Sequence, residues 1–299
     1  MQNLLHRRGF LSVLAAGPLA AGLPGESAAH TAPAGNSPRL LPGCCAYSYG
    51  THLKSGRMTM EDFILKAVEL GVLGVEITVY WLKSTEPQYL AGLRALGRKQ
   101  GMPFSGVAIG TQMCQPDAVK RREAVEAIRK WVDATDMLGS SHLRVFGDVM
   151  PAGATESQGI TWVAEVMKAA CDYSGKKGIT LGMETHLGLT AKGANVIEIL
   201  RRVDSPFAGC TLDISNWHDA PYADIEACLP YATSAHIRDY YGEGAKKTPL
   251  DMDRIFGMFA AAGYKGYMSV EYEGDEDPFT GVPKLVEKTK TLCRKYSSA

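Results

Sequence analysis

The chain has 299 residues, of which 45% are hydrophobic and 21% are charged, so it is long and apolar enough to form one large globular domain. Lysine and arginine together number 32, as do aspartate and glutamate, and the formal net charge is zero. Because nucleic-acid-binding proteins usually present a basic face, this balance argues against a nucleic-acid partner.

The N-terminal segment differs from the rest of the chain. The sequence Arg7–Leu11 opens an apolar run that ends at Leu23, and small residues follow at 27–29. This order is typical of a secretory signal, and its Arg-Arg-x-Phe-Leu start resembles a twin-arginine signal, which carries folded cargo. We predict a signal peptide at 1–29, a flexible linker at 30–39 and export to the periplasm. An ordinary signal with two arginines and an uncleaved membrane anchor are the alternatives. The apolar core is shorter than the roughly 20 residues of a spanning helix, so we expect no stable membrane insertion after signal cleavage.

From residue 40 onward, short apolar runs alternate with longer amphipathic segments. The predicted strands are 43–48, 72–79, 103–109, 142–146, 179–184, 207–213, 232–237 and 267–271. The predicted helices are 59–70, 87–100, 116–138, 159–174, 195–203, 223–229, 250–262 and 283–296. Thr59 and Asp62 form a capping-box pattern at the first helix, and Gly71 ends it.

Eight strand–helix units in strict alternation predict a parallel sheet, and their length favours closure into an α/β fold, a (β/α)8 TIM barrel. The strands are nearly continuous apolar runs, as expected where both faces of a sheet are buried. No glycine-rich G-x-G-x-x-G turn follows the first strand, which disfavours a dinucleotide-binding fold. We therefore predict a single barrel domain over 40–299.

Four successive strands in the second half of the chain end at or beside an acidic residue or a histidine. These residues are Glu184, Asp213, His236 and Glu271. Active residues of such barrels lie at the carboxyl ends of the strands, and an isolated charge there costs several kcal/mol unless it is paired or bound to metal. We expect the four to meet around one divalent cation. Three carboxylates with one imidazole suit Mn²⁺, Mg²⁺ or Co²⁺, with Zn²⁺ as an alternative. Taken singly, each acid is equally explained by a helix cap or a salt bridge, and the histidine by core packing.

Further polar residues near the strand ends are candidates for substrate binding. Glu76 is placed to bind a substrate hydroxyl, or to pair structurally with Arg144. His186 follows the fifth strand and has either a substrate-binding, a ligand-orienting or a structural role. Arg238 lies two residues after His236, so both side chains share one face of the strand.

Three more groups near the strand ends have weaker assignments. Asn216, three residues after the strand-six aspartate, is included among the substrate-binding candidates. Trp217, Tyr240 and Tyr241 follow strands six and seven and have two interpretations, as the wall of a sugar pocket or as loop packing. The pair Cys44–Cys45 is interpreted as packing rather than catalysis, and the seven scattered cysteines specify no disulfide pairing.

Six short motifs at or near the predicted strand ends carry a resemblance to one known family. They are Gly-Val-Glu-Ile at 74–77, Leu-Arg-Val-Phe-Gly at 143–147, Glu-Thr-His at 184–186, Leu-Asp-x-x-Asn at 212–216, His-Ile-Arg-Asp at 236–239 and Val-Glu-Tyr-Glu at 270–273. Over roughly residues 43–293 the chain resembles the xylose isomerase-like barrel superfamily, in particular its sugar phosphate isomerase/epimerase proteins. The resemblance implies that the four strand-end residues bind the metal and that Glu184 and Glu271 form the catalytic acid/base pair. It departs from the ketose 3-epimerases, which carry a histidine where Asn216 stands and an arginine where Gly242 stands.

The sequence therefore predicts a divalent-metal-dependent sugar isomerase or epimerase that removes a proton next to a carbonyl and passes through an enediolate. Loss of a β-substituent from the same enediolate would instead make a lyase acting on 3-keto-glycosides. Two alternatives are less favoured. One is an endonuclease-IV-like phosphodiesterase, which would require more histidines for a multi-zinc site and a basic face for DNA. The other is a sugar-binding protein without catalytic activity. The expected partner is a small-molecule sugar or glycoside, and the sequence is compatible with a homo-oligomer.

Overall fold

The computed structural model of the protein describes residues 37–147, 149–216, 221–242 and 246–297. The predicted signal peptide at 1–29, most of the predicted linker and Trp217 lie outside the described residues. Within the described ranges, no helix combines the length and the apolar character that a membrane crossing requires.

The strands of the barrel are short and separated by longer helices. They are β1 (Arg39–Cys45), β2 (Val75–Thr78), β3 (Phe104–Ala108), β4 (His142–Phe146), β5 (Thr180–Glu184), β6 (Ala208–Asp213), β7 (Ala232–Ile237) and β10 (Lys265–Val270). The longer helices are α2 (Met60–Leu70), α3 (Pro87–Lys99), α4 (Ala118–Leu138), α5 (Glu156–Ser174), α6 (Gly193–Val203), α7 (Tyr222–Cys228), α8 (Met252–Ala261) and α9 (Pro278–Tyr296). Shorter elements are α1 (Gly50–Lys54), η1 (Ala46–Tyr49), η2 (Val79–Trp81), η3 (Gly175–Lys177), η4 (Gly188–Ala191), η5 (Leu229–Tyr231), β8 (Tyr240–Tyr241) and β9 (Thr248–Pro249).

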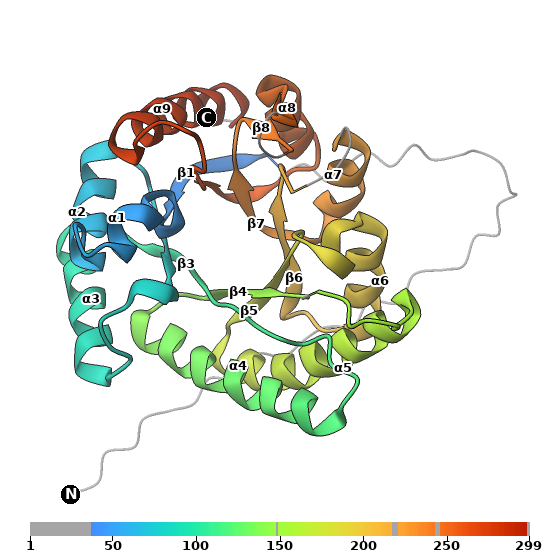
Figure 1. The fold of residues 1–299 in the computed structure, drawn as a ribbon. Coiled ribbons are helices and arrows are strands. Elements are labelled where there is room, and N and C mark those ends of the chain that lie inside the picture. The colour runs from blue at the N-terminus through green and yellow to red at the C-terminus, as the bar shows by residue number, and fades with distance from the viewer. Residues whose placement is uncertain (1–36, 148, 217–220, 243–245, 298–299) are drawn as a thin grey trace, which may run out of the picture. The chain divides into compact units, whose positions relative to one another are not determined.

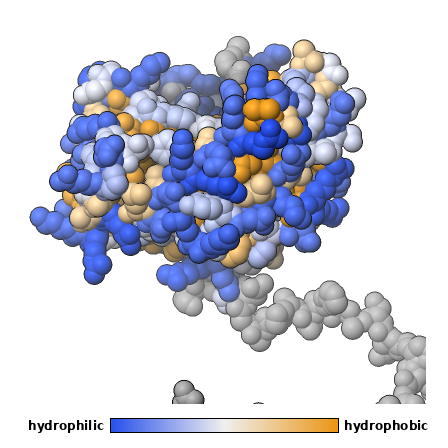
Figure 2. Space-filling view, turned by 90° about the horizontal axis from the view of Figure 1, so that it is seen from below, coloured by the Kyte–Doolittle hydropathy of each residue, from blue (hydrophilic) through white to orange (hydrophobic). Residues whose placement is uncertain are grey.

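The strands close into a parallel barrel in the order β1-β10-β7-β6-β5-β4-β3-β2, and the helices surround it (Figure 1). This confirms the predicted (β/α)8 barrel. The core consists of buried apolar side chains from the strands and from the facing sides of the helices. On the face drawn in Figure 2, hydrophilic residues cover most of the described surface and hydrophobic residues form small patches between them.

The start of the barrel differs from the sequence prediction. The first strand begins at Arg39, where it pairs with Lys265 of β10, and it ends at Cys45 rather than at Ser48. It ends early because Ser48 fastens the following turn: its hydroxyl donates to the carbonyl of Val270 at 2.9 Å and accepts from the backbone N–H of Tyr272 at 2.9 Å. The chain after β1 is thereby held over the carboxyl end of β10.

The last helix also begins earlier than predicted. Pro278 occupies its first turn, and the Asp277 side chain caps it by accepting from the N–H of Phe279 at 2.8 Å. A proline suits this position because its missing N–H has no helical partner there. Pro283, the predicted start, lies inside the helix instead. The capping box predicted at Thr59 and Asp62 is present.

Candidate functional site

The strand register brings the four predicted ligand residues together. Asp213 of β6 pairs directly with His236 of β7, and His236 pairs on its other side with Ser269, two residues before Glu271. Glu184 ends β5, the neighbour of β6. One donor atom from each of the four residues lies within 4.8 Å of the other three, and all four residues are buried. The arrangement thus gathers three carboxylates and one imidazole at the carboxyl end of the barrel.

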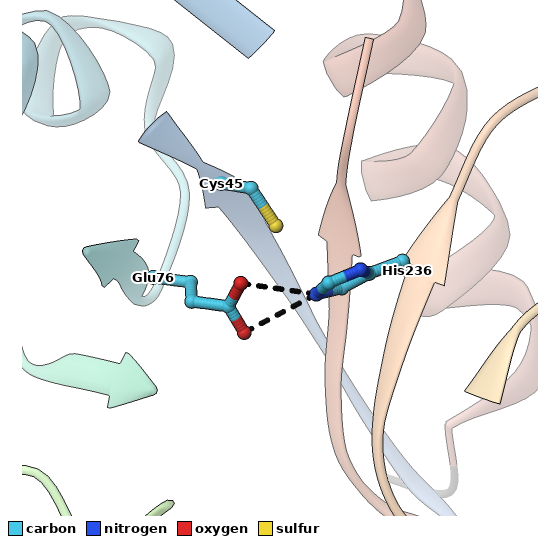
Figure 3. A group of neighbouring side chains, drawn as sticks. All are labelled: Cys45, Glu76 and His236. Atoms are coloured by element: carbon cyan, nitrogen blue, oxygen red, sulfur yellow. Dashed lines mark hydrogen bonds and ion pairs between the residues drawn. The ribbon is translucent and has the colours of Figure 1, made fainter. Parts of the chain in front are cut away.

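The two ring nitrogens of His236 face different surroundings. Its Nε2 lies 3.0 Å from Oε1 and 3.2 Å from Oε2 of Glu76, which reaches across from β2 (Figure 3). A carboxylate only accepts, so we assign the ring proton to Nε2. Nδ1 is buried without a hydrogen-bond partner and lies 3.4 Å from Oε2 of Glu271 and 3.8 Å from Oε1 of Glu184. A ring nitrogen with a free lone pair among carboxylates fits a divalent cation.

The electrostatic surroundings of His236 are strongly negative. Burial alone would lower the pKa of the imidazole, but Cys45, Glu271 and Glu76 raise it well above its ordinary value. Burial raises the pKa of Glu76, yet His236 and Arg144 outweigh it and bring that pKa down to about 2. The field that favours a proton on the ring equally favours a cation beside Nδ1.

Glu184 is held by Arg144 of β4. The Nε of Arg144 lies 2.9 Å from Oε2 of Glu184, and both side chains are almost fully buried. Arg144 also donates to the carbonyl of Ile109 at 3.1 Å and lies 4.0 Å from the ring centre of Phe146. The direct partner of Arg144 is therefore Glu184, whereas Glu76, one of whose predicted roles was pairing with Arg144, contacts His236 instead.

Asp213 is fixed by three neighbours from its own and the next strand. Its Oδ1 accepts from the backbone N–H of Ser215 at 2.7 Å. Its Oδ2 accepts from Nδ2 of Asn216 and from Nη2 of Arg238, each at 2.9 Å. Arg238 also donates to Oε2 of Glu273 at 2.6 Å. Arg238 and Asn216 both contact a carboxylate of the four-residue group, and their predicted role in substrate binding stays a prediction.

His186 and the two tyrosines lie at the edge of the site. The ring of His186 packs on Phe146, with centres 4.3 Å apart, and is not among the four gathered residues. The Tyr240 hydroxyl donates to the carbonyl of Glu273, and Tyr241 packs against the core. This hydrogen bond joins the segment after β7 to the segment after β10.

Three residues at the site are not indicated by the sequence pattern. Cys45 ends β1, pairs in register with Glu76, and offers its thiol within 4.8 Å of donor atoms of Glu76 and His236 (Figure 3). Burial raises the pKa of Glu273 to about 7 against the opposing effect of Arg238. Burial, then Glu273 and Glu271, raise the pKa of Tyr47.

Tyr47 belongs to an aromatic group formed by the segments after β1 and β2. Its ring centre is 5.7 Å from that of Trp81, which in turn is 5.8 Å from that of Tyr80. Tyr47 is 37% exposed and Tyr80 is 45% exposed, unusual for large aromatic residues. Exposed aromatic rings next to a polar cluster are typical of the wall of a small-molecule site.

The family described as xylose isomerase-like TIM barrel matches residues 64–293. The fold is similar to a solved structure of the IolI protein with a bound zinc atom, at 14% identity and a TM-score of 0.72, with 87% of this chain and 100% of that chain covered. It is also similar to a D-allulose 3-epimerase from Methylomonas sp. in complex with D-allulose, at 18% identity and a TM-score of 0.67, with 87% and 98% covered. A third similar structure is the 3-keto-D-glucoside 4-epimerase YcjR from E. coli, at 15% identity and a TM-score of 0.66, with 85% and 99% covered. No curated protein sequence matches the chain significantly.

Proposed function

Because the chain belongs to the xylose isomerase-like TIM barrel family, we propose that it is a divalent-metal-dependent sugar isomerase or epimerase. The observation that carries this proposal is the gathering of four buried donor residues around the partnerless Nδ1 of His236. Similar folds include two sugar epimerases and a zinc-containing protein, which supports the same reading.

The proposed metal ligands are Glu184, Asp213, His236 and Glu271, all buried donors within reach of one another. Oxygen-rich donors favour Mn²⁺, Mg²⁺ or Co²⁺, and the imidazole keeps Zn²⁺ as an alternative. A divalent cation held there acts as a Lewis acid toward a carbonyl oxygen and makes the neighbouring C–H more acidic.

The protein's own residues supply proton transfer and positioning. Glu184 and Glu271 are the proposed acid/base pair, because both carboxylates face the same point near Nδ1 of His236 from two different strands. The guanidinium of Arg144, whose Nε lies 2.9 Å from Oε2 of Glu184, positions that carboxylate. Arg238 and Asn216 hold Asp213 in place, while the ring of His186 is proposed to meet substrate hydroxyls.

A lyase acting on 3-keto-glycosides is the second candidate. The first step, removal of a proton next to a carbonyl, is the same in both reactions, and a β-substituent would then leave. The similar fold of a 3-keto-D-glucoside 4-epimerase favours this candidate, as do the exposed aromatic rings of Tyr47 and Tyr80. We also propose export to the periplasm, which rests on the sequence of residues 1–29 and is tested by fractionating cells that produce the tagged full chain.

Solvent exchange tests the proposed chemistry. The Mn²⁺-loaded protein in D₂O is incubated with ketoses and 3-keto-glycosides, and deuterium incorporation is followed by mass spectrometry alongside product formation. Glu184→Gln and Glu271→Gln are expected to reduce exchange by roughly 10²–10⁴-fold. Glu165→Gln, an exposed acid of α5 that pairs with Arg121, is the matched control and should exchange normally. If no compound exchanges and none is converted, the proposed function is wrong.

A further inference from the structure

We infer that the site takes an uncharged sugar or glycoside and rejects analogues that carry a phosphate or carboxylate group. The inference rests on the proposed function and adds the charge class of the substrate. It comes from the described charges around the site, the composition of the segments that follow the strands, and the aromatic group at the mouth.

The first argument is the balance of charge inside the site. Five carboxylates face it, and the cations among them are two guanidinium groups. The carboxylates are those of Glu76, Glu184, Asp213, Glu271 and Glu273, and the guanidinium groups are those of Arg144 and Arg238. Carboxylate groups therefore outnumber guanidinium groups five to two around the site. A dianionic substituent would enter a field of its own sign in a poorly solvated place.

The second argument is that both arginines are already occupied. Arg238 donates to Ser215, Glu273, Asp213 and Asn216, so four of its five N–H groups have partners. Arg144 is paired with Glu184 and bonded to a backbone carbonyl. Neither guanidinium therefore offers the free two-pronged face that binds a phosphate or carboxylate.

The third argument comes from the segments after the strands. Phosphate in such barrels is frequently bound after strands seven and eight. Here the segment 271–277, which follows β10, the eighth strand of the barrel, contains five acidic residues and no lysine or arginine. The described residues 109–117, 149–155 and 214–216, which follow β3, β4 and β6, also include no lysine or arginine.

Three of the five lysines that follow the other strands pair with acids, and one of these is Lys192, which pairs with Glu156. Lys247 pairs with Asp275 at 2.7 Å, and Lys83 pairs with Glu61 at 3.4 Å. At the same end of the barrel, exposed faces of Tyr47 and Tyr80 flank Trp81. Aromatic faces suit the C–H surface of a neutral sugar ring.

Matched pairs of probes test the charge class: D-fructose with D-fructose 6-phosphate, and D-allulose with D-allulose 6-phosphate. Each is assayed for deuterium exchange with the Mn²⁺-loaded protein, and binding of inorganic phosphate is measured by calorimetry on the metal-free protein. Variant Glu273→Gln removes the carboxylate that pairs with Nη1 of Arg238 and leaves the other three partners of Arg238 in place. Variant Glu126→Gln makes the same charge change on the exposed face of α4 and is the control.

The neutral sugar of each pair is expected to exchange deuterium at least about tenfold faster than the corresponding 6-phosphate. A tenfold ratio requires only a small difference in binding free energy between the two compounds. Glu273→Gln should strengthen phosphate binding and narrow the ratio, and Glu126→Gln should do neither. A phosphorylated probe that exchanges faster, or phosphate binding that is tightest in the unaltered protein, would overturn the inference and leave the proposed function standing. If no probe exchanges while phosphate binding improves only in Glu273→Gln, the proposed function loses support, and of the inference only the rejection of phosphate is upheld.

Discussion

The carboxylate of Glu76 meets Nε2 of His236 at 3.0 and 3.2 Å from the opposite side of the barrel interior. This contact commits one ring nitrogen to donation and turns the other toward Glu184 and Glu271. A carboxylate that receives the second N–H of a ligand histidine fixes the ring and makes it a better donor to metal. Glu76 is thus a positioning residue that acts through His236.

Glu76→Gln is expected to weaken Mn²⁺ binding about 10–100-fold, because a neutral amide orients the ring less firmly and supplies no charge. Calorimetric titration with Mn²⁺ measures this change, and circular dichroism checks that the fold is retained. Glu123→Gln, on the exposed side of α4, is the control for a lost negative charge. Equal Mn²⁺ affinity in the three proteins would show that Glu76 does not act through His236.

Metal binding should also raise the melting temperature, since a ligand that binds only the folded state stabilises it by about 2.7 kcal/mol at a concentration one hundred times its dissociation constant. Thermal unfolding with and without Mn²⁺ measures the shift, and EDTA should reverse it. Asp213→Asn should lose most of the shift relative to its own metal-free melting temperature. A shift of the same size in Asp213→Asn would remove Asp213 from the ligand set.

The buried pair of Arg144 and Glu184 should be energetically coupled. Arg144→Met is expected to lower the free energy of unfolding by about 3–5 kcal/mol, because it leaves a buried carboxylate without its counter-charge. Adding Glu184→Gln should recover part of that loss. Urea unfolding of both single variants and the double variant, all in EDTA, gives the coupling energy. Additive effects would argue against a direct interaction.

The capping box of α2 predicts a dependence of stability on pH. Hydrogen bonds from the side chain and the backbone of Thr59 lower the pKa of Asp62. A carboxyl group whose pKa is lowered in the folded state stabilises the fold above its unfolded pKa of about 3.9, and this contribution disappears as the pH falls through the lower folded pKa.

Asp62→Ala should therefore cost about 0.5–1 kcal/mol near pH 7 and progressively less below about pH 4. Urea unfolding of the variant and the unaltered protein across this range measures the difference. Glu123→Ala, an exposed acid within α4, should show no comparable trend. A cost for Asp62→Ala that stays constant down to pH 3 would contradict the assigned role.

Much of the barrel follows from the sequence because its strands are continuous apolar runs and its helices have clear caps. The grouping of Glu184, Asp213, His236 and Glu271 was predictable because β5, β6, β7 and β10 are neighbours whose carboxyl ends meet at one edge. Alternation along β7 likewise placed Arg238 on the side of His236.

The contact between Glu76 and His236 was not predictable in the same way. Their strands, β2 and β7, are separated in the sheet by β1 and β10, so only closure of the barrel brings them face to face. Cys45 was interpreted as packing, because a small apolar residue at a strand end has the pattern of a core residue. The early end of β1 depends on hydrogen bonds from Ser48 to a segment more than 200 residues away, which local propensity does not contain.

Gly106 on β3 lies beside the carboxylate of Glu76. A Cβ atom there would be 3.0 Å from Oε2 and 3.3 Å from Cγ of Glu76, and 3.4 Å from Nδ1 of His142. One added methyl group would therefore press on the side chain that steers His236 while altering no proposed ligand. A substitution at position 106 would therefore change the orientation of His236 indirectly, through Glu76. Engineering of the proposed site for a different cation can begin at this position rather than at the four donor residues.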